Sequence, residues 1–219
     1  MLKKLVSGVL PGLSLGNGRL PGLQRATPGA EPLTFKVEHS IEVTTPGAFS
    51  LDGIIPADAE AWCVEADGPG GGGSGRDGGG GGAGSPGGGG GKASTDIQIN
   101  DGRAKSVSGT IGTGGTGGGL NTNGNAGTAT TISVGSFSMT ANSGSGGLFG
   151  VGPGTGGTAT GGKINITGAT GEANLGPTNT GGLGGSGYRR ANRGGQAVLT
   201  NSGTAGENGG ALIRWWTKK

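Results

Sequence analysis

The stretch GPGGGGSGRDGGGGGAGSPGGGGGK, residues 68–92, constrains the fold of this chain more than any other part of the sequence. Glycine occupies 17 of the 24 positions from 68 to 91. Because glycine loses more backbone freedom on ordering than any other residue, such a run is a flexible linker unless segments elsewhere in the chain hold it. The fold therefore depends on whether the chain supplies those partners.

The composition of the chain limits the size of any apolar core. Among 219 residues there are 60 glycines, several times the usual share of about 7%, and only 4% of the residues are aromatic. Apolar residues concentrate in residues 33–66 and 211–216. We therefore expect an N-terminal arm (1–32), a small antiparallel β region (33–67) and a glycine-rich body (68–219) that a C-terminal strand closes.

Charge and cysteine content exclude several classes of protein. The net charge is +3 and only 13% of the residues are charged, so the dense basic stripe of a nucleic-acid-binding protein is missing. The single cysteine, Cys63, rules out an internal disulfide framework. No apolar run reaches the roughly 18 residues that a spanning helix needs, so we expect no membrane span.

The N-terminal arm repeats one short motif. Leu-Pro-Gly-Leu occurs twice, so that Leu10, Leu13, Leu20 and Leu23 flank two Pro-Gly turns. Exposed apolar repeats are unusual without a partner, which favours an arm that buries these leucines at an assembly interface. A disordered tail is the alternative.

Residues 33–67 show the alternation of apolar and polar side chains that is typical of strands. It occurs in LTFKVE, SIEV and AWCVEAD, and the last of these places Trp62 and Val64 on the face opposite Cys63 and Glu65. Turn sequences such as TTPGAF separate the stretches. The pattern predicts a small antiparallel sheet of three or four strands, from whose last strand the glycine run leaves.

Further glycine-rich tracts favour an ordered bundle over a linker. A left-handed helix with three residues per turn has no internal hydrogen bonds, so such segments lie side by side and exchange N–H to C=O bonds. Ordering a residue costs on the order of 1–2 kcal/mol and a net hydrogen bond returns about 1 kcal/mol, so only a packed array is stable. The further tracts are 111–119, 123–127, 142–157, 180–187 and 204–210. The predicted fold is mainly irregular and all-β, with packed polyglycine II helices, short strands and almost no α-helix.

The C-terminal stretch GGALIRWWTKK is apolar and β-prone. Trp215 and Trp216 point to opposite faces of an extended strand, so at least one is expected to be buried or to lie at an assembly interface. Such an ending also favours an ordered body.

No motif predicts a cofactor or a metal ion. GGGGGKAS at 87–94 approaches a phosphate-binding loop, but Pro86 and Ala93 occupy the positions where that loop needs glycine and Ser or Thr. The acidic residues lack both the paired carboxylates of a glycosidase and the spacing of a calcium loop.

No residue group predicts catalysis either. The only histidine, His39, has Glu38 and Ser40 as strand neighbours, which face the opposite side. Cys63 lies in an apolar strand and is expected to be a buried, inert thiol. We expect a protein without enzymatic activity.

Three elements follow one another along residues 35–216. An apolar strand leads into a glycine run (AWCVEADGPGGGG), a second tract follows (VSGTIGTGGTGGG), and a last tract closes on a strand (GENGGALIRWW). This order resembles the glycine-rich domain of bacteriophage and prophage tail proteins. It is similar in particular to the tail-fibre tip adhesins of some T-even-type phages, which stack polyglycine helices and contact the host receptor through loops at the distal end.

The resemblance implies a tail-fibre or tail-tip subunit in the virion. Its implied partners are other phage tail proteins and a host surface receptor such as lipopolysaccharide or an outer-membrane protein. The resemblance also implies a homo-oligomer, with a trimer favoured, that the N-terminal arm attaches to the virion. Two other classes remain open: an ice-binding protein with stacked polyglycine helices, against which the irregular inserts speak, and a purely structural protein of a virion or a secreted matrix.

In such an adhesin, recognition falls on the inserts between tracts. A tyrosine suits stacking on a sugar or an apolar edge, and guanidinium groups suit phosphate or carboxylate. The candidate receptor-binding residues are Tyr188, Arg189, Arg190, Asn192 and Arg193. A solvated turn is the alternative interpretation of this insert.

A second insert, LFGV, contains large apolar residues inside a glycine tract. Leu148 and Phe149 are expected to fill gaps between glycine helices as a small local core. An exposed apolar contact is the alternative.

Overall fold

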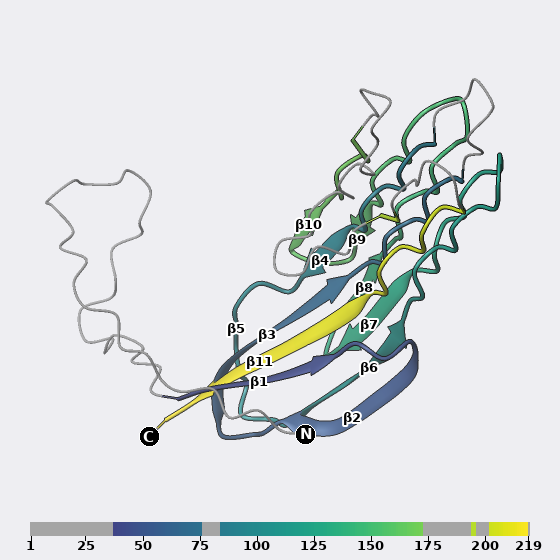
Figure 1. Ribbon diagram of the computed structural model, residues 1–219. Coiled ribbons are helices and arrows are strands. Elements are labelled where there is room, and N and C mark those ends of the chain that lie inside the picture. Colours follow the sequence, from purple (N-terminus) through teal and green to yellow (C-terminus); the bar gives the residue numbers. More distant parts are fainter. Residues whose placement is uncertain (1–36, 76–83, 173–193, 196–201, 219) are drawn as a thin grey trace, which may run out of the picture. The chain divides into compact units, whose positions relative to one another are not determined.

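The computed structural model in Figure 1 describes residues 37–75, 84–172, 194–195 and 202–218. All of them belong to one compact unit, residues 34–219. The described residues form β-strands and no helix, which confirms that this part of the protein is all-β. Within them there is accordingly no helix that could cross a membrane.

The strands form two antiparallel sheets. Sheet A contains β1 (Val37–Val43), β3 (Ala59–Asp67), β4 (Lys92–Ser94), β5 (Gln98–Ile99), β10 (Ile164–Ile166) and β11 (Gly210–Thr217). Its order is β1-β11-β3-β4-β10, and β5 pairs with β3. Sheet B contains β2 (Gly47–Ile55), β6 (Lys105–Ile111), β7 (Thr130–Val134), β8 (Phe137–Ala141) and β9 (Ala159–Thr160), in that order.

The apolar core lies between the two sheets. Alternate residues of each strand face it, because successive side chains of a strand point to opposite sides. Trp62 of sheet A meets Phe137 of sheet B edge-on, with ring centroids 6.1 Å apart. The buried cluster is Ile55, Ala59, Trp62, Val64, Ala66, Ala93, Val107, Ile111, Ile132, Val134, Met139, Ala141, Ala211 and Ile213.

The first three strands pair with distant partners. The sequence predicts one small sheet from residues 33–66, but β1 and β3 both pair with β11, and β2 pairs with β6 of the other sheet. The alternation expected in SIEV and AWCVEAD is correct, whereas residues 33–36 of LTFKVE lie outside the described residues. The turn expected at TTPGAF is wrong in its second half, because Gly47, Ala48 and Phe49 already belong to β2. The expected neighbours are also wrong, because the pattern of a strand indicates which face is buried and not which strand lies beside it. The C-terminal stretch therefore lies inside sheet A, between β1 and β3.

Seven glycine-rich segments, here called the glycine tracts, continue the strands at one end of both sheets (Figure 1). Three follow a strand: 68–75 after β3, 112–119 after β6 and 142–147 after β8. Four lead into a strand: 84–91 before β4, 122–128 before β7, 154–158 before β9 and 203–209 before β11. None of these segments is a strand, so their backbone groups need partners outside a regular sheet.

The backbone hydrogen bonds of tract 68–75 repeat every three residues. Successive amides donate to three different neighbouring segments, and every third amide returns to the same one. The donor–acceptor pairs, at 2.8–3.2 Å, are Gly68–Gly91, Gly70–Glu207, Gly71–Gly88, Gly72–Asn125, Gly73–Thr204, Ser74–Ser85 and Gly75–Thr122.

The carbonyls of the same tract accept hydrogen bonds from three further segments. The donors are Gly115 and Gly118, Gly144 and Gly147, and Gly195. Tract 68–75 is thus bonded to six surrounding segments: 84–91, 112–119, 122–128, 142–147, 194–195 and 203–209. It lies at the centre of the tracts, with its polar groups satisfied from all sides.

The tracts approach one another too closely for side chains at the buried glycines. A Cβ atom at Gly71 would overlap the backbone carbonyl of Ser145, and one at Gly88 would overlap that of Thr155. Backbone atoms cannot rotate out of the way, so these positions require glycine. Larger residues such as Thr113 and Thr116 occur where a tract faces solvent.

We predict that Gly71→Ala destabilises the protein by roughly 3 kcal/mol, because the new methyl group has to push two backbones apart. Gly119→Ala in tract 112–119 is the matched control, since its Cβ would meet only the side-chain oxygen of Thr122 at 3.5 Å. We expect this control to stay within about 0.5 kcal/mol of the wild type. Urea unfolding of both variants measures the difference, and equal stability of the two would contradict the close packing.

Candidate functional site

Residues 119–122, the 120 turn, connect the tracts that follow β6 and precede β7. The amide and the hydroxyl of Thr122 both donate to the carbonyl of Gly119, at 3.1 and 3.0 Å. Asn121 has φ 54°, as the third position of a type II turn requires, and asparagine tolerates this left-handed conformation. Leu120, at the second position, is 55% exposed.

Residues 148–152, the 150 turn, close the next pair of tracts in the same way. The amides of Val151 and Gly152 donate to the carbonyl of Leu148, both at 3.2 Å, and the amide of Leu148 donates to Gly152 at 2.9 Å. Gly150 has φ 68°, a conformation that favours glycine. Leu148 is 41% exposed and Val151 is 80% exposed.

The two turns lie side by side. The side-chain oxygen of Asn123 accepts a hydrogen bond from the amide of Phe149 at 2.8 Å, and the amide of Gly124 donates to Gly147 at 2.9 Å. Both turns therefore lie at the same end of the tracts, the end farthest from the sheets. We call this region the apolar tip: Leu120, Leu148, Phe149 and Val151.

The local core expected at LFGV is absent. Leu148 and Val151 are exposed and Phe149 is half-buried. The structure therefore agrees with the alternative interpretation, in which these apolar residues are exposed and available for a contact. The reason is that these residues form the turn beyond the packed tracts, and a side chain at most of the buried glycines between the tracts would overlap a neighbouring backbone.

The apolar tip belongs to a long uncharged part of the chain. No charged residue and no histidine occurs between Lys105 and Lys163. This part includes both turns and the four tracts that continue sheet B. Electrostatic attraction by these residues therefore contributes nothing to binding at the tip.

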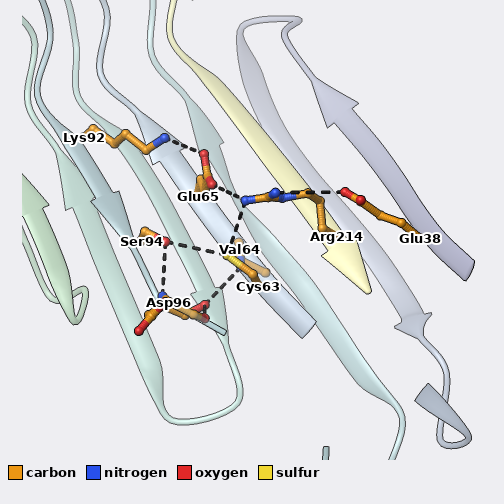
Figure 2. A network of polar contacts seen from close by, with 9 residues as sticks. Glu38, Cys63, Val64, Glu65, Lys92, Ser94, Asp96 and Arg214 are labelled. Atoms are coloured by element: carbon orange, nitrogen blue, oxygen red, sulfur yellow. Dashed lines mark hydrogen bonds and ion pairs between the residues drawn. The ribbon is translucent and has the colours of Figure 1, made fainter. Parts of the chain in front are cut away.

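A charged cluster lies on the outer face of sheet A, opposite the core (Figure 2). Glu65 forms ion pairs with Lys92 and with Arg214, the latter at 2.6 Å, and Arg214 also lies 3.9 Å from Glu38. The side chains of Glu65 and Lys92 are only 8% and 6% exposed. The cluster joins β1, β11, β3 and β4, so it ties together strands that are far apart in the sequence.

The charges around Glu65 control its ionisation. Burial alone would raise the pKa of Glu65, but the hydrogen bond and charge of Lys92, together with Arg214, outweigh burial and hold the pKa below its ordinary value. Glu65 is therefore ionised and paired at neutral pH.

Asp67, the last residue of β3, has the opposite environment. Its Oδ1 atom is buried and has no hydrogen-bond partner among the described residues. Burial raises the pKa of Asp67 to about 6, the charges of Glu65 and Glu42 add to this effect, and Lys92 opposes it. The junction between sheet A and tract 68–75 therefore contains a carboxyl group that titrates near neutral pH.

The residues considered for catalysis have structural neighbours. The Cys63 thiol is buried, 3.7 Å from the hydroxyl of Ser94. His39 lies 3.2 Å from the hydroxyl of Thr217 and stacks on Trp215 with ring centroids 5.3 Å apart. No cluster of three or more His, Cys, Asp or Glu residues that could hold a metal ion occurs in the described ranges.

The remaining predicted site residues fall into two groups. Trp215 packs against the core, whereas Trp216 lies on the outer face of sheet A, where Arg214 is 5.9 Å from its ring centroid. The receptor-binding candidates and the arm leucines lie outside the described residues: Tyr188, Arg189, Arg190, Asn192, Arg193, Leu10, Leu13, Leu20 and Leu23.

The sequence analysis missed Leu120 and Asn123. A signal was available in GGGLNTNG, since a single leucine followed by asparagine between two glycine tracts is typical of a turn with a left-handed residue. The hydrogen bond from Phe149 to Asn123 spans 26 positions, and no local pattern predicts it.

Comparison with known proteins gives no match. No protein-family model matches the chain, and no curated protein is significantly similar to it.

We predict that Glu65→Gln destabilises the protein by about 3–5 kcal/mol, because it removes the buried carboxylate that pairs with both the Lys92 ammonium and the Arg214 guanidinium. Glu60→Gln is the control, since its partner Lys218 is 81% exposed. That change is expected to alter stability by less than about 1 kcal/mol. Denaturant unfolding at pH 7 measures both, and a similar loss in the two variants would contradict a stabilising role of the buried pair.

We predict that Asp67→Asn raises stability at pH 7 by about 2–3 kcal/mol. Since the folded state holds the Asp67 proton up to about pH 6 and the unfolded state releases it near pH 4, Asp67 lowers stability as the pH rises through this interval. The wild-type and Asn curves should therefore diverge between about pH 4 and 6. Urea midpoints measured at several pH values test this prediction, with the exposed Asp58→Asn as control. If the stabilities of the wild type and of Asp67→Asn changed in parallel with pH, the raised pKa of Asp67 would be contradicted.

Proposed function

We propose that the protein is a structural and adhesive subunit of a phage tail, a fibre or tip protein that binds the host cell envelope. The observation that carries the proposal is the three-residue hydrogen-bond period of tract 68–75. A helix with three residues per turn produces this period. Together with the resemblance of the chain to tail-fibre tip adhesins, it favours a scaffold of packed polyglycine II helices.

Two further features support polyglycine II helices. None of the glycines in the seven glycine tracts has a positive φ, as expected for a left-handed helix with φ near −75°. The six neighbours of tract 68–75 also fit helices whose amides point outward in three directions. Such a scaffold has few soft internal degrees of freedom.

A rigid scaffold suits an adhesive role. Loops that are already ordered lose less conformational entropy on binding, which leaves more of the interaction energy for affinity. The turns at the end of the tracts, with the insert around Tyr188, are the proposed receptor-binding region. The arm leucines and the C-terminal tryptophans are the proposed assembly contacts, in a homo-oligomer for which we favour a trimer in the virion tail.

The test is competition for adsorption. We expect the purified protein to reduce adsorption of the phage that carries it to host cells, and an antibody against it to neutralise infection. The same protein unfolded by heat is the control for non-specific effects. Normal adsorption at saturating protein, with no neutralisation by antibody, would contradict the adhesive role.

Ice binding is the second candidate, and one observation favours it. Hydroxyl and amide side chains pair at intervals of three residues along neighbouring tracts: Thr113–Thr128 at 3.2 Å, Thr116–Asn125 at 2.8 Å, Ser145–Thr155 at 3.2 Å and Asn142–Thr158 at 2.9 Å. The turns and inserts interrupt this regularity. Thermal hysteresis in cooled solution measures ice binding directly, and its absence would remove this candidate.

A further inference from the structure

The apolar tip presents exposed hydrophobic side chains at one end of the tracts. Three of its members are large apolar residues exposed by 41–80%: Leu120, Leu148 and Val151. They belong to two neighbouring turns, and Asn123, which follows the 120 turn, accepts a hydrogen bond from Phe149 of the 150 turn. Scattered exposed leucines are ordinary on a soluble protein, but several large exposed apolar residues on neighbouring turns at one end of the tracts indicate a contact surface.

Many amides in the two turns already have partners within the protein. Those of Thr122, Leu148, Val151 and Gly152 donate to backbone carbonyls, and that of Phe149 donates to the side chain of Asn123. An amide with an internal partner leaves water at little energetic cost, whereas an unpaired one is expensive to bury in hydrocarbon. The paired amides therefore lower the energetic cost of moving the tip from water into a less polar environment.

The absence of charged side chains in both turns also favours burial of the tip. Residues 106–162, which include both turns, contain no charged side chain, although Gly75, which bonds to Thr122, is followed in the sequence by Arg76 and Asp77. Burial of the tip thus requires no desolvation of an ion from this part of the chain. The residues next to the tip, Asn121, Thr122 and Asn123, are neutral and polar, which suits the headgroup layer of a membrane.

We infer that the apolar tip inserts its side chains into the outer surface of a lipid bilayer, at the boundary between headgroups and acyl chains. The tip protrudes as two adjoining turns, and a deformable lipid surface accommodates such a shape without a complementary pocket. The inference deepens the proposed function and rests on it for the identity of the membrane, the envelope of the host cell. A few apolar side chains give weak, reversible insertion, so several copies in one particle strengthen attachment.

The experiment is flotation of the full chain with vesicles of phosphatidylcholine alone. We expect binding that changes little between low and high salt, because the inserted side chains are uncharged and phosphatidylcholine carries no net charge. The double variant Leu148→Ser, Val151→Ser should reduce binding about tenfold or more, since each change removes an inserted side chain. Ile99→Ser is the matched control, an apolar residue 64% exposed on β5 of sheet A, and should bind like the wild type.

Two results would overturn the inference: no binding of the wild type to these vesicles, or an equal loss of binding in the double variant and in Ile99→Ser. An unchanged unfolding midpoint shows that each variant is folded. If the protein blocks phage adsorption but does not bind vesicles, the lipid contact is wrong, the proposed adhesin stands and a protein or saccharide is its target. If it binds vesicles but does not block adsorption, the adhesive function is wrong and the lipid contact stands.

Discussion

Hydrogen bonding between backbones without side chains is the interaction on which the rest of the structure depends. Each amide of tract 68–75 from Gly70 onward has its partner in another segment, and none in its own tract. A single such segment has nothing to hold it in place. The tracts therefore form together or not at all, and the order of any one depends on its neighbours.

The β-sandwich supplies the starting point for this assembly. Every tract begins or ends at a strand of sheet A or sheet B, so the strands fix the position and direction of the tracts. The apolar core is consequently small and confined to the strands, and the tracts add almost no apolar burial. This division explains how a chain with 4% aromatic residues builds an ordered body.

Much of the local structure could be predicted from the sequence, and little of the long-range structure could. The alternation in AWCVEAD correctly separates Trp62 and Val64 from Cys63 and Glu65, because the two faces of β3 differ in environment. The position of β11 between β1 and β3 follows from contacts across most of the chain. The same holds for the ion pairs of Glu65, whose partners are brought close only by sheet pairing.

The attachment of both tracts of a pair to neighbouring strands has an evolutionary consequence. Register in each pair is set at the sheet, so the connecting turn contributes little to holding the tracts in place. A mutation at the tip of a turn, such as at Leu120 or Val151, leaves the buried glycines and their hydrogen bonds in place. Selection on such a surface proceeds separately from selection on foldability, and new specificities arise without loss of the body that carries them.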